Sequence, residues 1–252
     1  MKKLLIYLYI GAISIFLAVA HTSWQERTSH ASPQLAEISV KKEEVSPTES
    51  LMKNWPAAAK EAYAEAQKQG RPLKLAIVGS PSLGTKTNGW SVQLKKQLEE
   101  AYKGTVAVQL YEFDLTSQQF VQSKAYEPVV AWKPDVVLYE TLLLKDNGVV
   151  APNDHLGYTK QVMAAVKQGN PKATFILQPA HPLPGSVHYP KQEETLQQFA
   201  ARNKIAYIDH WQAWPDLKGE EIEVYVTGDQ SAPTEKGHAV WAKFLSSYFI
   251  AK

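Results

Sequence analysis

The sequence of 252 residues contains no cysteine. This absence excludes disulfides, a thiolate nucleophile and a cysteine-ligated metal centre. Any chemistry must therefore use hydroxyl, imidazole, carboxylate or amide groups.

An excess of charge of one sign is also absent. Lys and Arg number 27 against 25 Asp and Glu, which gives a formal net charge of +2, and the basic residues are scattered along the chain. No basic stripe of the kind that binds nucleic acid is present, so we expect no nucleic-acid partner.

Patterns for bound cofactors and metals are missing too. No Gly-x-Gly-x-x-Gly or phosphate-binding loop follows the first predicted strand, so we expect no nucleotide cofactor. The seven histidines are dispersed, none forms a His-x-x-x-His pair, and carboxylates do not cluster beside them. We therefore expect no metal site.

What the sequence does have is an export signal at its start. Lys2 and Lys3 precede an uncharged apolar run from residue 4 to residue 20. Ala18-Val19-Ala20 fits cleavage by a signal peptidase, but the run also approaches the roughly 20 residues of a spanning helix. Residues 1–20 are thus predicted to be a signal peptide or a signal anchor. In both cases the remaining chain lies outside the cytoplasm, either anchored to the cell membrane by this segment or secreted.

Two further regions follow. Residues 21–51 are polar, rich in Ser, Thr, Glu and Lys, and have no sustained apolar period, which indicates a flexible stalk. Residues 52–252 are apolar enough to form one buried domain. The lack of disulfides and the export signal together favour a bacterial cell-surface protein.

The domain alternates between strand and helix patterns. A helix is expected at 56–69 with Asn54 as its cap, and a closing helix at 235–249. Apolar β-rich segments predict strands at 73–78, 106–113, 135–139, 174–177 and 206–208, and helical spacing predicts helices at 90–102, within 117–132, at 156–167 and at 193–203. This order predicts an α/β fold: a three-layer, flavodoxin-like parallel sheet with helices on both faces, preceded by an N-terminal apolar helix.

Polar residues follow the strands, where open parallel sheets bind ligands. The segments are Gly79-Ser80-Pro81-Ser82-Leu83-Gly84, then Glu140-Thr141 with Lys145-Asp146-Asn147-Gly148, and Asp229 to His238 before the last helix. With KPDVVLYE, NPKATFILQP and PTEKGHAVWAKFL, these segments resemble the SGNH/GDSL hydrolases from about Leu73 onward. The resemblance implies a serine nucleophile after the first strand, a histidine base with an aspartate before the last helix, and oxyanion donors after strands two and three.

The nucleophile position departs from the family pattern. Two residues after Gly79 stands Pro81, which has no hydroxyl. Ser82 matches the family's Ser-Leu if one residue is inserted, and it is our choice of nucleophile. Ser80 is the other hydroxyl close by, and the remaining alternative is that the site has no nucleophile.

The base position departs further. Asp229-Gln230-Ser231-Ala232-Pro233 matches the family's Asp-x-x-His-Pro with Ala232 in place of the histidine. His238, six residues downstream, is our first choice of base with Asp229 as its partner, or else a packing residue at the helix start. His181 and His210, which follow the fourth and fifth strands, are the other candidates.

For the oxyanion donor we choose Asn147, whose neutral amide can donate to a developing negative charge. The competing interpretation is a turn residue in Asp146-Asn147-Gly148. No glycine follows the second strand, so a second donor has to be a backbone amide within residues 114–117.

These residues lead to two functional hypotheses. The first is an extracytoplasmic ester hydrolase that acts on an acylated carbohydrate or another small ester through an acyl-enzyme. The second is a binding or scaffold protein of the cell surface that kept the SGNH fold and lost its serine–histidine pair, which Pro81 and Ala232 favour. An unrelated flavodoxin-like module is disfavoured by the order of the motifs.

Overall fold

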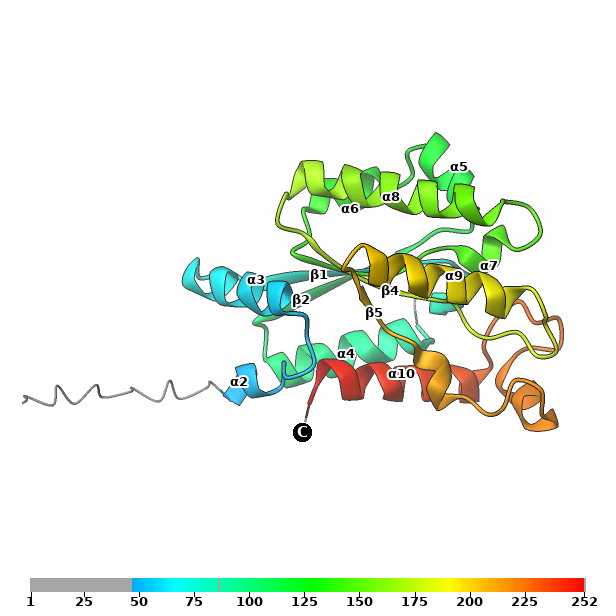
Figure 1. Ribbon diagram of the computed structural model, residues 1–252. Helices are drawn as coiled ribbons and strands as arrows, with labels where there is room; N and C mark the ends of the chain where they lie inside the picture. The colour runs from blue at the N-terminus through cyan, green and yellow to red at the C-terminus, as the bar shows by residue number, and fades with distance from the viewer. Residues whose placement is uncertain (1–46, 86, 252) are drawn as a thin grey trace, which may run out of the picture. The chain divides into compact units, whose positions relative to one another are not determined.

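The computed structural model describes residues 47–85 and 87–251 (Figure 1). The predicted signal or anchor segment, residues 1–20, and residues 21–46 of the predicted stalk lie outside the described residues. Within the described ranges no helix is long and apolar enough to span a membrane. The first described element is α2 (Pro47–Ser50), and the side chain of Leu51 packs against the core. Residues 47–51, predicted to be the end of the flexible stalk, are therefore part of the folded domain.

Five parallel strands form the sheet, in the order β2-β1-β3-β4-β5. Apolar side chains cover both of its faces, as is usual for parallel sheets. Because the strands are parallel, all five carboxyl ends lie along one edge of the sheet, which we call the carboxyl edge. The strands are β1 (Leu73–Gly79), β2 (Val106–Glu112), β3 (Val136–Glu140), β4 (Thr174–Gln178) and β5 (Ala206–Tyr207).

Helices cover both faces and enclose two apolar cores, so the predicted three-layer α/β architecture is confirmed (Figure 1). On one face lie α3 (Ala57–Lys68), α4 (Trp90–Tyr102) and α10 (Glu235–Phe249). On the other lie α5 (Ser117–Gln122), α6 (Glu127–Trp132), α8 (Pro152–Gly169) and α9 (Tyr189–Arg202), with the short α7 (Leu143–Asp146) after β3.

The local differences from the expected elements have simple causes. Asn54 does not cap α3, because Pro56 occupies the N-cap and the Asn54 amide donates to the carbonyl of Ser247. The helical part expected within 117–132 consists of two helices: α5, capped by Thr116, and α6, which begins at Glu127 with Pro128 in its first turn. α7 was not expected, since four residues give too short a pattern to detect.

Candidate active site

The serine turn follows β1 at the carboxyl edge. Here η1 (Pro81–Leu83) is a single 3-10 turn with Pro81 at its first position and Ser80 as its N-cap. The Ser80 hydroxyl accepts a hydrogen bond from the backbone amide of Ser82 at 3.2 Å. Pro81 stands where the family pattern expects serine, and its ring fixes the backbone φ angle there. The hydroxyl of Ser82 follows one residue later in the turn.

Ser82 is paired with His181, which follows β4. The Oγ of Ser82 lies 3.0 Å from the Nδ1 of His181. The Nε2 of the same ring lies 3.1 Å from the backbone carbonyl oxygen of Gln230. Since a carbonyl only accepts, Nε2 carries the proton and Nδ1 accepts from the Ser82 hydroxyl. A hydroxyl, an imidazole and a carbonyl are therefore arranged in series.

The protonation of His181 follows from its burial. Desolvation lowers its pKa to about 4, the hydrogen bond to Gln230 opposes that shift, and the nearby His238 adds to it. At neutral pH the ring is uncharged, which is the state that can take a proton from a hydroxyl.

The segment that carries His181 is held by η2 (His210–Ala213), which follows β5. The Nε2 of His210 lies 3.0 Å from the carbonyl oxygen of Pro179, and the indole of Trp211 donates to the carbonyl of Ala180 at 2.8 Å. The Nδ1 of His210 accepts from the indole of Trp214 at 3.0 Å, which leaves the proton on Nε2. Burial lowers the pKa of His210 to about 3, so this contact stays neutral.

A buried carboxylate lies beside the serine turn. Glu140 ends β3 with none of its surface exposed, and its carboxylate accepts from the backbone amides of Ser80 at 2.6 Å and Leu142 at 3.2 Å. Burial raises the pKa of Glu140, while hydrogen bonds from Ser80 and Leu142 oppose that rise. Sequence reasoning assigned this residue no role, although an acid at the end of an apolar strand is itself an unusual pattern.

Comparison with known proteins gives a clear result for the fold. No protein-family model and no curated protein matches the sequence. Solved structures do match over most of their own length, at low sequence identity. An acetylxylan esterase from Geobacillus stearothermophilus, in a catalytic mutant form, shares 14% identity with a TM-score of 0.55 over 71% of this chain and 94% of its own.

Two further structures agree. An alpha/beta hydrolase enzyme from the metagenome of Lake Arreo has a TM-score of 0.57 at 14% identity, over 71% of this chain and 95% of its own. A putative lipolytic protein of the G-D-S-L family from Desulfitobacterium hafniense has a TM-score of 0.53 at 16% identity, over 69% and 98%. The domain has the SGNH/GDSL-hydrolase fold.

In this domain the histidine beside Ser82 and its carbonyl partner come from different loops than the family pattern expects. The family pattern expects the histidine before the final helix, where this chain has Ala232. Here that loop supplies the carbonyl of Gln230, and the loop after β4 supplies the histidine. The Gln230 carbonyl was missed because a backbone acceptor leaves no mark on the sequence.

The predicted base and its aspartate have other partners. The Nδ1 of His238 accepts from the backbone amide of Trp90 at 3.2 Å, and burial lowers its pKa to about 4. The exposed Asp229 accepts from Thr227 and Ser231, which lower its pKa to about 2. Asp229 thus fixes the turn that carries Gln230 and holds no histidine.

Asn147 is the C-cap of α7. Its backbone amide donates to the carbonyl of Leu144, as in a turn at the end of a helix. The preceding Asp146 is buried and accepts from the amide and hydroxyl of Ser117, with the Nδ1 of His155 at 2.7 Å. The Ser117 amide, which belongs to the segment expected to offer an oxyanion donor, is therefore already used.

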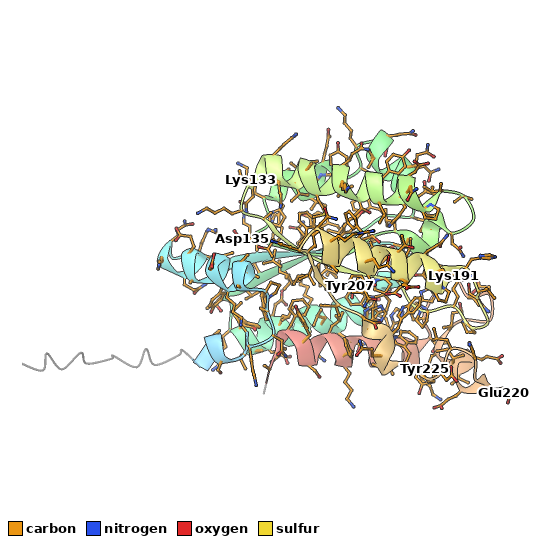
Figure 2. The ribbon with its side chains drawn as sticks, in the orientation of Figure 1. Lys133, Asp135, Lys191, Tyr207, Glu220 and Tyr225 are labelled. Atoms are coloured by element: carbon orange, nitrogen blue, oxygen red, sulfur yellow. The ribbon has the colours of Figure 1, made fainter. Side chains whose placement is uncertain are left out.

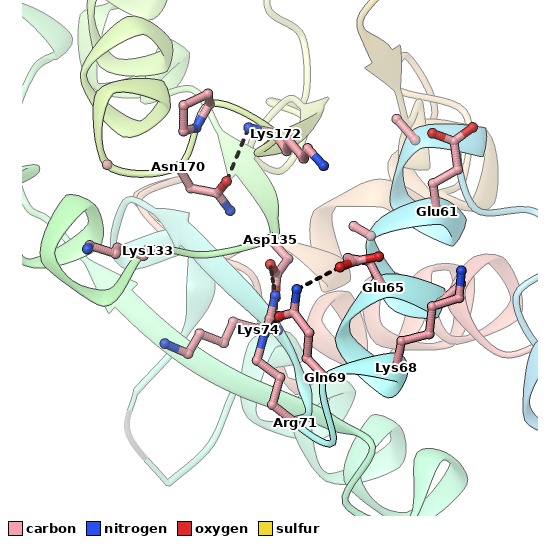
Figure 3. Close-up of a pocket in the computed structure, with 15 residues that line it drawn as sticks. Glu61, Glu65, Lys68, Gln69, Arg71, Lys74, Lys133, Asp135, Asn170 and Lys172 are labelled. Carbon is pink, nitrogen blue, oxygen red and sulfur yellow. Dashed lines mark hydrogen bonds and ion pairs between the residues drawn. The ribbon is translucent and has the colours of Figure 1, made fainter.

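A cavity of about 910 Å³ lies at the opposite edge of the sheet (Figure 3). It surrounds Arg71 and Asp135, whose two hydrogen bonds measure 2.7 and 3.0 Å. Figure 2 shows Asp135 at the far end of the sheet from Glu220 and Tyr225 of η3 (Glu220–Tyr225), in the loops beyond the carboxyl edge. This cavity contains neither Ser82 nor His181.

Among the described residues, no group of three or more His, Asp or Glu side chains is arranged so that it could hold a metal ion.

Proposed function

We propose that this protein is a serine ester hydrolase in which Ser82 is the nucleophile, His181 the general base and the Gln230 carbonyl the group that orients the base. The observation that carries the proposal is the 3.0 Å contact between the Ser82 hydroxyl and Nδ1 of a histidine whose other nitrogen already has an acceptor. A serine hydroxyl is a weak nucleophile until a neighbour takes its proton, and this arrangement supplies that neighbour.

The reaction follows from the arrangement. As the Ser82 oxygen bonds to the ester carbonyl carbon, His181 takes the hydroxyl proton at Nδ1 and then gives it to the departing alcohol. Water attacks the acyl-enzyme by the same route and releases the acid. During this step His181 is an imidazolium, and its Nε2–H group continues to donate a hydrogen bond to the Gln230 carbonyl. An uncharged carbonyl stabilises that cation less than a carboxylate does, so we expect modest turnover.

The substrate class and location extend the proposal. One of the structures with this fold is named as an acetylxylan esterase. Together with the apolar N-terminal segment, this supports an acylated carbohydrate, or another small ester, outside the cytoplasm. The domain is then secreted, or anchored to the cell membrane through residues 1–20.

A second candidate is a binding or scaffold protein with the SGNH fold and no activity. Burial favours it: Ser82 is 2% exposed and His181 is fully buried. The amides of Ser80, Ser82 and Leu83 also have partners within the protein, so none of them is free to donate to an oxyanion. Access to the serine is thus what separates the two functions.

A fluorophosphonate probe tests the proposal directly on the full chain. We expect the native protein to be labelled and Ser82→Ala to abolish labelling, whereas Ser80→Ala keeps the nucleophile and should still be labelled, at a lower rate. Release of acetate from an acetylated xylan then tests the substrate class. A native protein that folds and stays unlabelled points to the binding or scaffold function.

A further inference from the structure

We infer that Glu140 is a positioning residue, which acts through Ser80 to hold the Ser82 hydroxyl against His181. The inference rests on the proposed function and extends it to a residue that touches neither substrate nor the reacting oxygen.

The contacts form one continuous series. The Glu140 carboxylate accepts from the Ser80 amide at 2.6 Å, and the Ser80 hydroxyl accepts from the Ser82 amide at 3.2 Å. The Ser82 hydroxyl then meets His181. Hydrogen bonds to a carboxylate are about twice as strong as neutral ones, so the series starts from its strongest link.

The backbone is built around this carboxylate. A Cβ on Gly79 would lie 2.7 Å from Oε2 of Glu140 and 2.8 Å from its Cβ. Only glycine leaves room for Glu140 to reach across the end of β1. Leu142 adopts a left-handed conformation with φ 65°, and its amide donates to the other carboxylate oxygen at 3.2 Å. Leucine rarely adopts a positive φ, and such backbone conformations are concentrated at functional sites.

Charge makes the role specific. A buried carboxylate is costly unless its oxygens are satisfied, and here two backbone amides from different strand ends satisfy them. A substitution that removes the acceptor oxygen facing the Ser80 amide breaks that hydrogen bond. The turn that carries Ser80 and Ser82 is then free to shift. Small misplacements of a nucleophile reduce rates by as much as about 10²-fold.

The experiment compares rates of fluorophosphonate labelling on the full chain at pH 7. Glu140→Gln keeps one acceptor oxygen but turns an NH2 group toward one of the amides. We expect it to be labelled at least about 10-fold more slowly than native, with the midpoint of the pH profile unchanged, because His181 still titrates. The matched control is Asp135→Asn, which alters another buried, hydrogen-bonded carboxylate at the opposite edge and should be labelled at the native rate.

Ser80→Ala and the double variant add an independent arm. Ser80→Ala should slow labelling. The variant that combines Ser80→Ala with Glu140→Gln should be no slower than Glu140→Gln alone, because both substitutions break the same series of hydrogen bonds. Labelling of Glu140→Gln at the rate of the Asp135→Asn control, or effects that multiply in the double variant, overturns the inference. A shifted pH midpoint also overturns it, since Glu140 would then act on proton transfer. If Glu140→Gln does not fold, a native rate for Ser80→Ala is decisive against it.

The two proposals fail in different ways. An unlabelled native protein refutes the esterase proposal and the Glu140 role with it. A native protein that is labelled, beside variants that match it, refutes the Glu140 role alone.

Discussion

His181 and His238 both reach the carboxyl edge, but their ring nitrogens have different partners. His181 faces a serine hydroxyl on one side and a carbonyl on the other. His238 uses its Nδ1 to accept from the Trp90 amide, so its lone pair is occupied. The partner of each nitrogen, rather than the position of the residue in a motif, decides which ring can take a proton.

This difference gives a prediction at the residue scale. His181→Ala should reduce fluorophosphonate labelling by about 10² to 10⁴-fold, the range that a general base contributes. His238→Ala, the matched control, should reduce it by less than about 10-fold, since its main loss is the hydrogen bond with the Trp90 amide. Equal losses in the two variants would assign the proton transfer to neither ring alone.

The pH dependence is a second prediction at this scale. His181 must be neutral to accept a proton, and burial lowers its pKa to about 4. Labelling should therefore hold as the pH falls through 6.5, the ordinary histidine value, and decline only near about pH 4. A rate measured from pH 8 to pH 3.5 on protein that stays folded decides this, and a midpoint near 6.5 would contradict the assignment of His181.

At the scale of elements, η2 connects β5 to the segment that carries His181. Its first two side chains reach back to the carbonyls of Pro179 and Ala180, the two residues before His181. Trp241 of α10 stacks on His210 with ring centroids 4.0 Å apart, which fixes η2 against the core. The loop that carries the proposed base is thereby held by η2 and α10.

Trp211→Phe tests this arrangement. The substitution keeps an aromatic ring but removes the N–H that donates to Ala180, a loss of about 1 kcal/mol. We expect labelling to slow several-fold while thermal unfolding changes little. Trp132→Phe in α6, away from the carboxyl edge, is the control and should leave labelling unchanged. A large fall in melting temperature without slower labelling would mark Trp211 as a packing residue.

At the scale of the whole molecule, the segment before α3 closes the core against the last helix. Trp55 is 3% exposed, donates to the carbonyl of Phe249 at 2.9 Å, and packs edge-on against Tyr102 and Phe249. The Ala251 amide donates to the Leu51 carbonyl. The two ends of the described domain are therefore joined.

This predicts where the chain can be shortened. A chain that starts at Pro47 should unfold at the same temperature as the full chain. A chain that starts at Ala57 loses Met52 and Trp55, and a buried Trp alone is worth about 3–5 kcal/mol. Calorimetry of both proteins tests the prediction, and equal melting temperatures would show that the segment is dispensable.

The sequence by itself determined the layers and the strands. Runs such as Leu73–Gly79 and Thr174–Gln178 are short, apolar and bounded by turn residues, because strands buried on both faces need that pattern. It placed Ser80 and Ser82 at the carboxyl edge, since both follow the first strand directly; the choice of Ser82 as nucleophile rests on the resemblance to the family's Ser-Leu and stays a prediction. Location stays a prediction because the N-terminal residues lie outside the described ranges, and substrate stays one because the similar structures share the fold at only 14–16% identity.

Only the tertiary structure decided how the site is connected. Ser82 and His181 are 99 residues apart, and the contact depends on two loops whose paths no local pattern dictates. The Gln230 carbonyl belongs to the backbone, which every residue has, so no residue type reveals it. Glu140 acquires its partners because β1 and β3 are neighbours in the sheet, although β2 lies between them in the sequence. Local periodicity is a property of neighbouring residues, whereas hydrogen bonds between loops depend on how the whole sheet is ordered.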